Sequence, residues 1–179
     1  MSLFLLIFWI MGICSFTFLG SWYARKYNKS DLLIGLYVTF VLVAQVLAAK
    51  VSNFDFGFVN FYGPSGVLVF AITFLLTDIV NEKFGRNEVH KMIFIAFISQ
   101  IAMVFFFWIG VKFPAAPFWT LQDAWSQIFN SVPRITVAGW IAFLASENFD
   151  AYIYAWFKKI TDFTTYYWTN LRKVACWYN

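Results

Sequence analysis

Charged residues are scarce in this sequence. Only 12% of its 179 residues are Asp, Glu, Lys or Arg, whereas a soluble domain usually carries about 25%. Apolar residues make up 61% of the chain and aromatic residues 23%. The shortage of charge therefore favours a membrane protein over a soluble one. The net charge of +4 does not indicate a nucleic-acid partner, because the basic residues lie between apolar runs rather than along one face.

Histidine and cysteine are also rare, which limits the chemistry available. The single histidine, His90, lies in a charged segment, where we expect it to be solvated. Cys14 and Cys176 lack the spacing of a disulfide framework or a metal site. There is no Ser/His/Asp or Cys/His set, no HExxH motif and no glycine-rich phosphate loop. We therefore predict that the protein is not an enzyme and that it holds neither a cofactor nor a metal ion.

Long uncharged runs are abundant, and they predict the fold. About twenty apolar residues span a bilayer, so we predict an all-α, polytopic integral membrane protein that forms one membrane domain over residues 1–179. The first run lacks the basic n-region and the cleavage site of a signal peptide. A Trp- and Pro-rich segment of mixed polarity, residues 112–133, predicts an interfacial helix. The five predicted transmembrane helices cover residues 3–24, 32–50, 64–81, 92–111 and 134–157.

Basic residues orient these helices. Lys and Arg follow the first, third and fifth predicted spans, as at Arg25, Lys83 and Lys158, whereas the other two loops carry them only at their edges. The positive-inside rule then predicts an external N-terminus and a cytoplasmic C-terminal end. Trp and Tyr residues near the span ends are typical of an aromatic belt.

Acidic side chains within two predicted spans are the candidate functional residues. Asp78 and Glu82 are four residues apart with Asn81 between them, so a helix places all three on one side. Glu147 and Asp150 are three residues apart and lie deeper in the fifth span. Acids cost a few kcal/mol in a bilayer interior and tend to face a cavity or a partner. We therefore predict that these residues bind a substrate.

Two charged residues have simpler alternatives. Glu82 lies near the predicted membrane surface, where it could pair with a nearby cation: Lys83, Arg86 or Lys91. Arg134 lies near the outer surface, several turns from Asp150. It is therefore either a membrane-edge anchor or a residue of an outer gate.

Buried carboxylates suit a transporter. A carboxylate accepts two parallel hydrogen bonds, as an amidine-like or guanine-like N–H edge requires, and a buried acid can exchange a proton during a transport cycle. An alternative of another class is an intramembrane enzyme with an all-carboxylate metal site made by Asp78, Glu82 and Asp150. A structural or assembly subunit is a third possibility.

Two segments resemble one known family. The run FLLTDIVNEKFGR resembles the signature F-L-x-T-D-x-x-N-E-x-x-G of the queuosine-precursor transporter family, also called the vitamin uptake transporter family. The run RITVAGWIAFLASENFDAYIYAWFKK resembles a second helix of that family. The resemblance extends from Leu32 to Lys159. Its motif residues correspond here to Thr77, Asp78, Asn81, Glu82 and Gly85 in the first run, and to Arg134, Glu147 and Asp150 in the second.

The resemblance implies a function. Members import 7-deazaguanine precursors of the tRNA base queuosine (preQ0 or preQ1) across the cell inner membrane, so the expected partners are a small-molecule substrate and the lipid bilayer. Two further partners are compatible with the resemblance: a second copy of this chain in a homo-oligomer, or an energising partner protein. One alternative is the substrate-binding subunit of an energy-coupling-type vitamin transporter.

The sequence departs from the family at two places. Position 147 is Glu where many relatives have Gln, which adds a charge to the site. The run YYWTNLRKVA begins a family pattern that continues into further helices, but CWYN follows it here. We therefore expect a chain that is truncated relative to the family, and a non-functional fragment is a further alternative.

Overall fold

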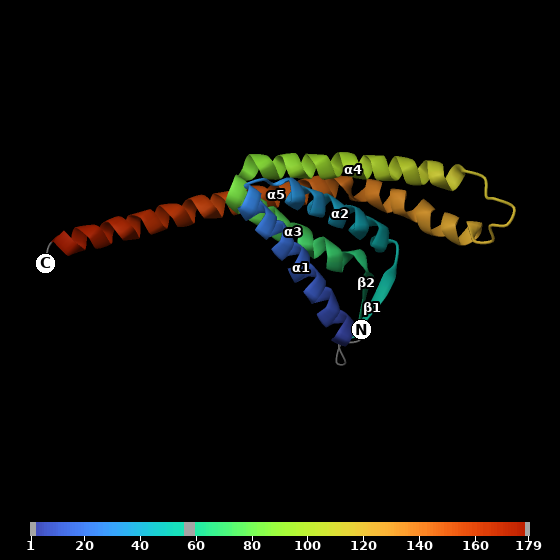
Figure 1. Cartoon of the computed structure of the whole chain (residues 1–179), viewed down its shortest axis with the longest axis horizontal. Coiled ribbons are helices and arrows are strands. Elements are labelled where there is room, and N and C mark those ends of the chain that lie inside the picture. The colour runs from blue at the N-terminus through green and yellow to red at the C-terminus, as the bar shows by residue number, and fades with distance from the viewer. Residues whose placement is uncertain (1–2, 56–59, 178–179) are drawn as a thin grey trace.

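The computed structural model describes residues 3–55 and 60–177. This part of the chain forms five helices and a two-stranded antiparallel sheet, which confirms the predicted all-α membrane class (Figure 1). In chain order the elements are α1 (Leu3–Tyr27), α2 (Asp31–Ala48), β1 (Val51–Asp55), β2 (Asn60–Pro64), α3 (Gly66–Phe84), α4 (Arg86–Lys112) and α5 (Gln122–Trp177).

Within the described residues, four helices are long and apolar enough to cross a membrane: Ile7–Tyr27, Asp31–Ala48, Arg86–Lys112 and Gln122–Thr161. The helix α3 differs because it carries Asp78, Glu82 and Lys83. It packs against α2, α4 and α5, and its buried face includes Thr73, Thr77 and Asn81 as well as apolar residues. Neighbouring helices therefore cover the buried polar side chains of α3, whereas Glu82 and Lys83 stay exposed at its end.

Polar contacts between helices show how they are oriented. Ser30 precedes α2 and donates to Glu88 at the start of α4 (2.6 Å), while Gln45 near the end of α2 reaches Gln100 further along α4 (3.4 Å). The helices α2 and α4 therefore run in the same direction. Lys83 at the end of α3 donates to the Ala24 carbonyl at the end of α1, so α1 and α3 finish together.

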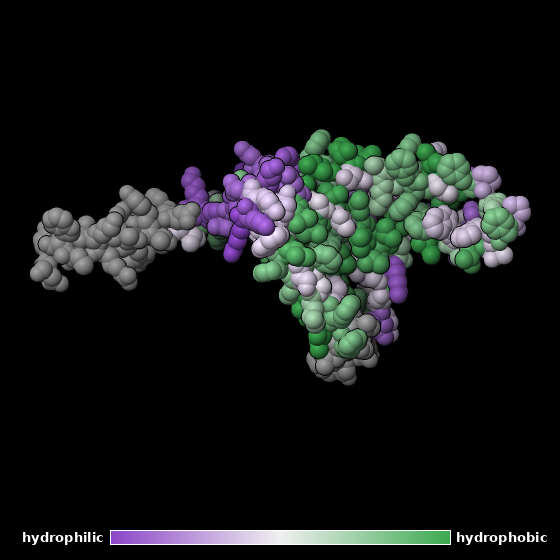
Figure 2. Space-filling view, viewed as in Figure 1, coloured by the Kyte–Doolittle hydropathy of each residue, from purple (hydrophilic) through white to green (hydrophobic). Residues whose placement is uncertain are grey.

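Hydrophilic side chains gather where α1 and α3 end and α2 and α4 begin. We call this the charged end; it includes Arg25, Lys83, Arg86, Glu88 and Lys158. Figure 2 shows the hydrophilic cluster beside α3, α4 and α5, with apolar side chains over most of the remaining bundle. The backbone of α5 continues past this end, away from the other helices (Figure 1).

Two local features differ from the sequence-based prediction. No element was predicted between the spans 32–50 and 64–81, but β1 and β2 form an antiparallel pair there, with Val51 opposite Pro64 and Asn53 opposite Tyr62. No separate interfacial helix forms within residues 112–133, because residues 122–133 are the first turns of α5.

Pro133 lies inside α5 without ending it. The helix before this proline is held against α4 by the ring of Phe129, whose centroid lies 4.8 Å from that of Phe107. A proline removes one helical hydrogen bond, and this tertiary contact supports the turns that precede it.

Glycine is required where α2 and α3 meet. A Cβ atom added to Gly66 would lie 2.2 Å from the Ala44 carbonyl oxygen, which is far inside van der Waals contact. Gly66 therefore lets the start of α3 lie directly against the backbone of α2. At the other end of α3, Gly85 has a φ of +84°, a conformation that glycine adopts without steric strain, and it separates α3 from α4.

Candidate functional site

Glu147 is fully buried, with 0% of its surface exposed. It lies on the face of α5 that also carries Thr136, Phe143 and Ala151, all buried and spaced by four or seven residues. This spacing keeps side chains on one side of a helix. The inward face of α5 therefore carries a carboxylate into the centre of the bundle.

Two threonines of α3 lie against this carboxylate. The hydroxyls of Thr73 and Thr77 lie 3.4 Å from its two oxygens, one on each. Each hydroxyl has one proton, and each has a closer acceptor within α3: the Phe70 carbonyl at 2.6 Å for Thr73, and the Thr73 carbonyl at 2.9 Å for Thr77. The contacts with Glu147 are therefore long and weak, and most of its capacity to accept hydrogen bonds is unused.

Few hydrogen bonds or charges around Glu147 offset the cost of burying its carboxylate. The Tyr37 hydroxyl of α2 faces the carboxylate without forming a hydrogen bond of standard geometry. Among the side chains that the structure describes, the ion pairs are Lys91–Glu88 and Lys158–Glu82, so no cation neutralises Glu147. A buried carboxylate without a cation is energetically costly, and such a group is a candidate for binding a donor from a ligand.

Asp150 and Asp78 lie on the side of this carboxylate nearer the charged end. Asp150 is half-buried, and one of its oxygens is inaccessible to solvent with no hydrogen-bond partner in the described part of the chain. Asp78 of α3 is also half-buried and lies close enough to Asp150 for their charges to repel. Acidic side chains of α3 and α5 therefore lie close to one another in the structure.

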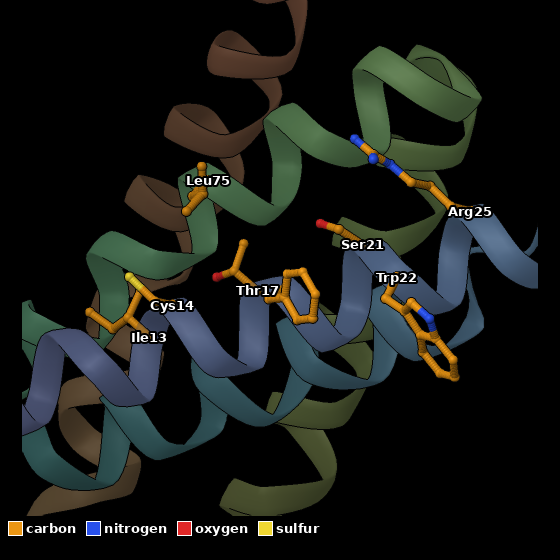
Figure 3. A pocket seen from close by; sticks show the side chains of 8 residues that line it. Ile13, Cys14, Thr17, Ser21, Trp22, Arg25 and Leu75 are labelled. Atoms are coloured by element: carbon orange, nitrogen blue, oxygen red, sulfur yellow. The ribbon is translucent and has the colours of Figure 1, made fainter.

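Asp78 also borders a cavity of about 310 Å³ between α1, α3 and α5. Its lining residues are Ser21, Ala24, Arg25, Asp78, Ile79, Glu82, Lys83 and Tyr154. A larger cavity of about 670 Å³ shares Ser21 and Arg25 with it and continues along α1 to Ile13. Figure 3 shows Ser21 and Arg25 extending from α1 towards α3, with Leu75 on the opposite wall. Both volumes lie in the range of small-molecule sites.

Asn81 is buried, but its side chain has a partner within the protein. Its amide nitrogen donates to the Ala151 carbonyl oxygen over 3.0 Å. This hydrogen bond joins α3 to α5 between the buried Glu147 and the charged end.

Glu82 is exposed at the charged end. Its carboxylate forms an ion pair with Lys158 (2.9 Å) and accepts a hydrogen bond from the Tyr154 hydroxyl (3.1 Å). The hydrogen bonds from Lys158 and Tyr154 hold the pKa of Glu82 below its usual value. A surface ion pair was one of the expectations for this residue, but its partner comes from α5 rather than from Lys83, Arg86 or Lys91.

Arg134 is exposed and lies apart from the acids. It precedes Glu147 by thirteen residues in the same helix, a separation of about 20 Å at 1.5 Å per residue. The structure therefore groups Glu147, Asp150, Asp78 and Asn81, places Glu82 in the lining of the cavity, and keeps Arg134 at a distance.

His90 is half-buried rather than solvated, which corrects the expectation from the sequence. Its Nε2 accepts a hydrogen bond from Arg86 (2.8 Å), and its Nδ1 lies 2.7 Å from the Asn148 side-chain oxygen. Because Nε2 accepts, Nδ1 carries the proton and donates to Asn148. His90 thereby connects α4 to α5 one residue from Glu147.

The alternative of a carboxylate metal site has no support in the described residues, where no three His, Cys, Asp or Glu side chains gather closely enough to hold a metal ion. Sequence reasoning did not find Tyr37 and Thr73 near Glu147. Thr73 precedes Thr77 by one turn, and this spacing was the available signal. Tyr37 gave none.

The helices that carry this site match a known family. A family model described as "Putative vitamin uptake transporter" matches residues 64–176, which include all of α3 and α4 and nearly all of α5. This chain belongs to the vitamin uptake transporter family. It is accordingly a multi-pass membrane protein of a transporter family.

One curated relative is also similar. The "Probable queuosine precursor transporter" of Bacillus subtilis (strain 168) is 28% identical over 95 residues, which cover 53% of this chain and 42% of the relative. The similar region therefore spans less than half of that relative. No solved structure matches the chain.

Proposed function

We propose that the chain binds 7-deazaguanine precursors of queuosine and contributes to their import across the cell inner membrane. The observation that carries this proposal is Glu147, a fully buried carboxylate whose contacts with Thr73 and Thr77 are long and which no described cation neutralises. Membership of the vitamin uptake transporter family and the name of the Bacillus relative support the cargo class.

The chemistry of Glu147 fits the edge of a 7-deazaguanine. The ring N–H and the exocyclic amine of a guanine-like base point in the same direction, and a carboxylate accepts two such parallel hydrogen bonds. Each carboxylate oxygen would replace a 3.4 Å contact with a threonine hydroxyl by a shorter hydrogen bond to the ligand. The threonine hydroxyls would keep their donation to the α3 backbone.

The cavity at Asp78 suggests a route to this site. In our proposal a ligand passes between α1 and α3, where Arg25, Asp78 and Glu82 line the cavity, and Asp150 lies between that cavity and Glu147. Asn81 holds α3 to α5 beside this route. The positive-inside rule would place the charged end in the cytoplasm, with Arg134 in the outer half of the membrane.

Binding to the purified protein and uptake by cells together test the proposal. The probe is labelled 7-cyano-7-deazaguanine, with uptake measured in cells that lack both synthesis and import of queuosine precursors. We expect saturable binding by the parent chain and strong loss of binding in Glu147→Gln. Glu88→Gln is the matched control, because Glu88 lies at the charged end with Lys91 and Ser30 as partners.

Each measurement has a distinct negative outcome. Equal binding by the parent and by Glu147→Gln would exclude Glu147 as the binding residue. Absence of binding by the parent chain would reject the proposed cargo. Binding without uptake would retain the cargo but reject import by this chain alone.

A further inference from the structure

Three buried polar groups have no hydrogen-bond partner in a region between α4 and α5 that the proposed function does not use. Within the described residues they are the side-chain nitrogen of Gln100, the hydroxyl of Thr136 and the indole nitrogen of Trp140. Gln100 and Thr136 are 0% exposed. Leaving a buried donor unsatisfied costs about 1–3 kcal/mol, so three such groups together require an explanation.

The packing of α4 on α5 brings these groups to within about one helical turn of one another. The antiparallel register is given by three side-chain contacts: His90–Asn148, Phe97–Trp140 and Phe107–Phe129. Moving a given number of residues towards the C-terminus of α4 therefore corresponds to moving nearly the same number towards the N-terminus of α5. This register places Gln100 level with Thr136, and Thr136 shares its face of α5 with Trp140, one turn away.

A side chain of α2 completes the group. The amide nitrogen of Gln45 donates to the side-chain oxygen of Gln100 over 3.4 Å. The Gln100 oxygen is therefore occupied, and its NH₂ group is left as a donor. Within this cluster there is no charged side chain.

We propose a second binding site, for a small uncharged molecule that presents a carbonyl oxygen or an aromatic ring nitrogen, formed by Gln45, Gln100, Thr136 and Trp140. We call it the neutral site. An indole N–H donates only, an amide NH₂ donates twice and a hydroxyl donates or accepts. The available groups are thus mainly donors, so the neutral site selects an acceptor, whereas Glu147 selects a donor.

The neutral site is separate from Glu147. Trp140 precedes Glu147 by two turns, about 10 Å along α5, and the buried Phe143 lies between them. On α2 the buried Val41 likewise lies between Tyr37, which faces Glu147, and Gln45. An apolar layer therefore divides the two polar levels, and the neutral site does not depend on the cargo proposed above.

Trp140 provides the test. Its fluorescence is isolated as the difference between the parent protein and Trp140→Phe, with 7-deazaguanine and the unrelated neutral molecule nicotinamide as probes. We expect at least one probe to change this emission saturably in the parent. In Gln100→Met and in Thr136→Val we expect the apparent affinity to fall by about tenfold, as for the loss of one hydrogen bond from a buried group.

Stability and a control variant separate this result from general damage. Thr136→Val removes a buried hydroxyl without a partner, so its unfolding temperature should equal or exceed that of the parent. Glu147→Gln should leave the nicotinamide response unchanged, which separates the neutral site from the proposed cargo site.

Two outcomes would overturn the neutral site. One is the absence of any saturable change in the Trp140 emission with both probes, which would mean that water alone occupies the region. The other is a response that Gln100→Met and Thr136→Val leave unaltered. Should Trp140→Phe fail to fold, calorimetric titration of both probes into the parent and Gln100→Met decides between the same outcomes.

Discussion

Two glutamates of this chain, Glu82 and Glu147, differ in their expected roles because their surroundings differ. Glu82 is exposed at the charged end, where Lys158 and Tyr154 satisfy its carboxylate. Glu147 is fully buried, has long contacts with two threonine hydroxyls and has no cationic partner among the described side chains. The carboxyl group with unused hydrogen-bonding capacity is the better candidate for binding, although both residues are glutamates.

The largest expected effect comes from Glu147→Gln, which keeps the shape of the side chain but replaces one acceptor oxygen with an amide donor. Hydrogen bonds to charged groups contribute about 1.5–3 kcal/mol, so the affinity for labelled 7-deazaguanine should fall by about 10- to 100-fold in equilibrium binding to the purified protein. The matched change Glu82→Gln should have little effect. If the two variants lost equal affinity for the ligand, Glu147 would not be the better candidate for the binding residue.

A second prediction concerns the helix that carries both Glu82 and the threonines. In Gly66→Ala the new Cβ would meet the Ala44 carbonyl, so α3 must shift and the free energy of unfolding should fall by about 1–3 kcal/mol, as in overpacked cores. Gly139→Ala is the control, because a Cβ there meets nothing within 4 Å and alanine favours a helix over glycine.

Thermal unfolding in detergent measures both glycine variants, and ligand binding sharpens the comparison. Movement of α3 should weaken binding at Glu147, because Thr73 and Thr77 move with the helix. A Gly66→Ala protein as stable as the Gly139→Ala control would contradict the close approach of α2 and α3.

Asn81→Ala should have a smaller effect. This change removes the hydrogen bond to the Ala151 carbonyl, and a buried hydrogen bond contributes about 0.5–1.5 kcal/mol. We therefore expect a decrease of this size in the free energy of unfolding from chemical denaturation. The exposed Asn130 gives the control, Asn130→Ala, for which no measurable change is expected. Similar values for the two variants would show that Asn81 does not join α3 to α5.

The smallest effect is expected at the ion pair of Glu82. Because its pKa is lowered in the folded protein, this glutamate stabilises the fold at neutral pH, and the contribution is lost as the pH falls through the lowered pKa. Lys158→Met should remove the interaction, so the difference in unfolding temperature between parent and variant should be small at neutral pH and should vanish in acid. A difference that grows on acidification would contradict this assignment.

Properties of single segments could be predicted from the sequence. The low charge and the long apolar runs gave the all-α membrane class, because about twenty apolar residues suffice to span a bilayer whatever surrounds them. The spacing of Asp78 and Asn81 placed both on one side of a helix, because helical periodicity is local. The two motif runs indicated the family that the comparison with known proteins then showed.

Contacts between distant segments could not be predicted in this way. The partner of Glu82 is Lys158, 76 residues later, rather than one of the cations nearby in the sequence. The paired strands β1 and β2 have mixed polarity, so their apolar pattern gave no clear strand signal.

The sequence alone therefore determined that this chain crosses membranes, which helices hold its acids and which family it resembles. Only the tertiary structure decided that Glu147 is buried with no cationic partner among the described side chains, that Lys158 and Tyr154 satisfy Glu82, and that Gln45 contacts Gln100. The physical reason is that burial and hydrogen-bond partners depend on which helix faces pack together. That packing is set by close approaches such as Gly66 against Ala44, which no single segment specifies.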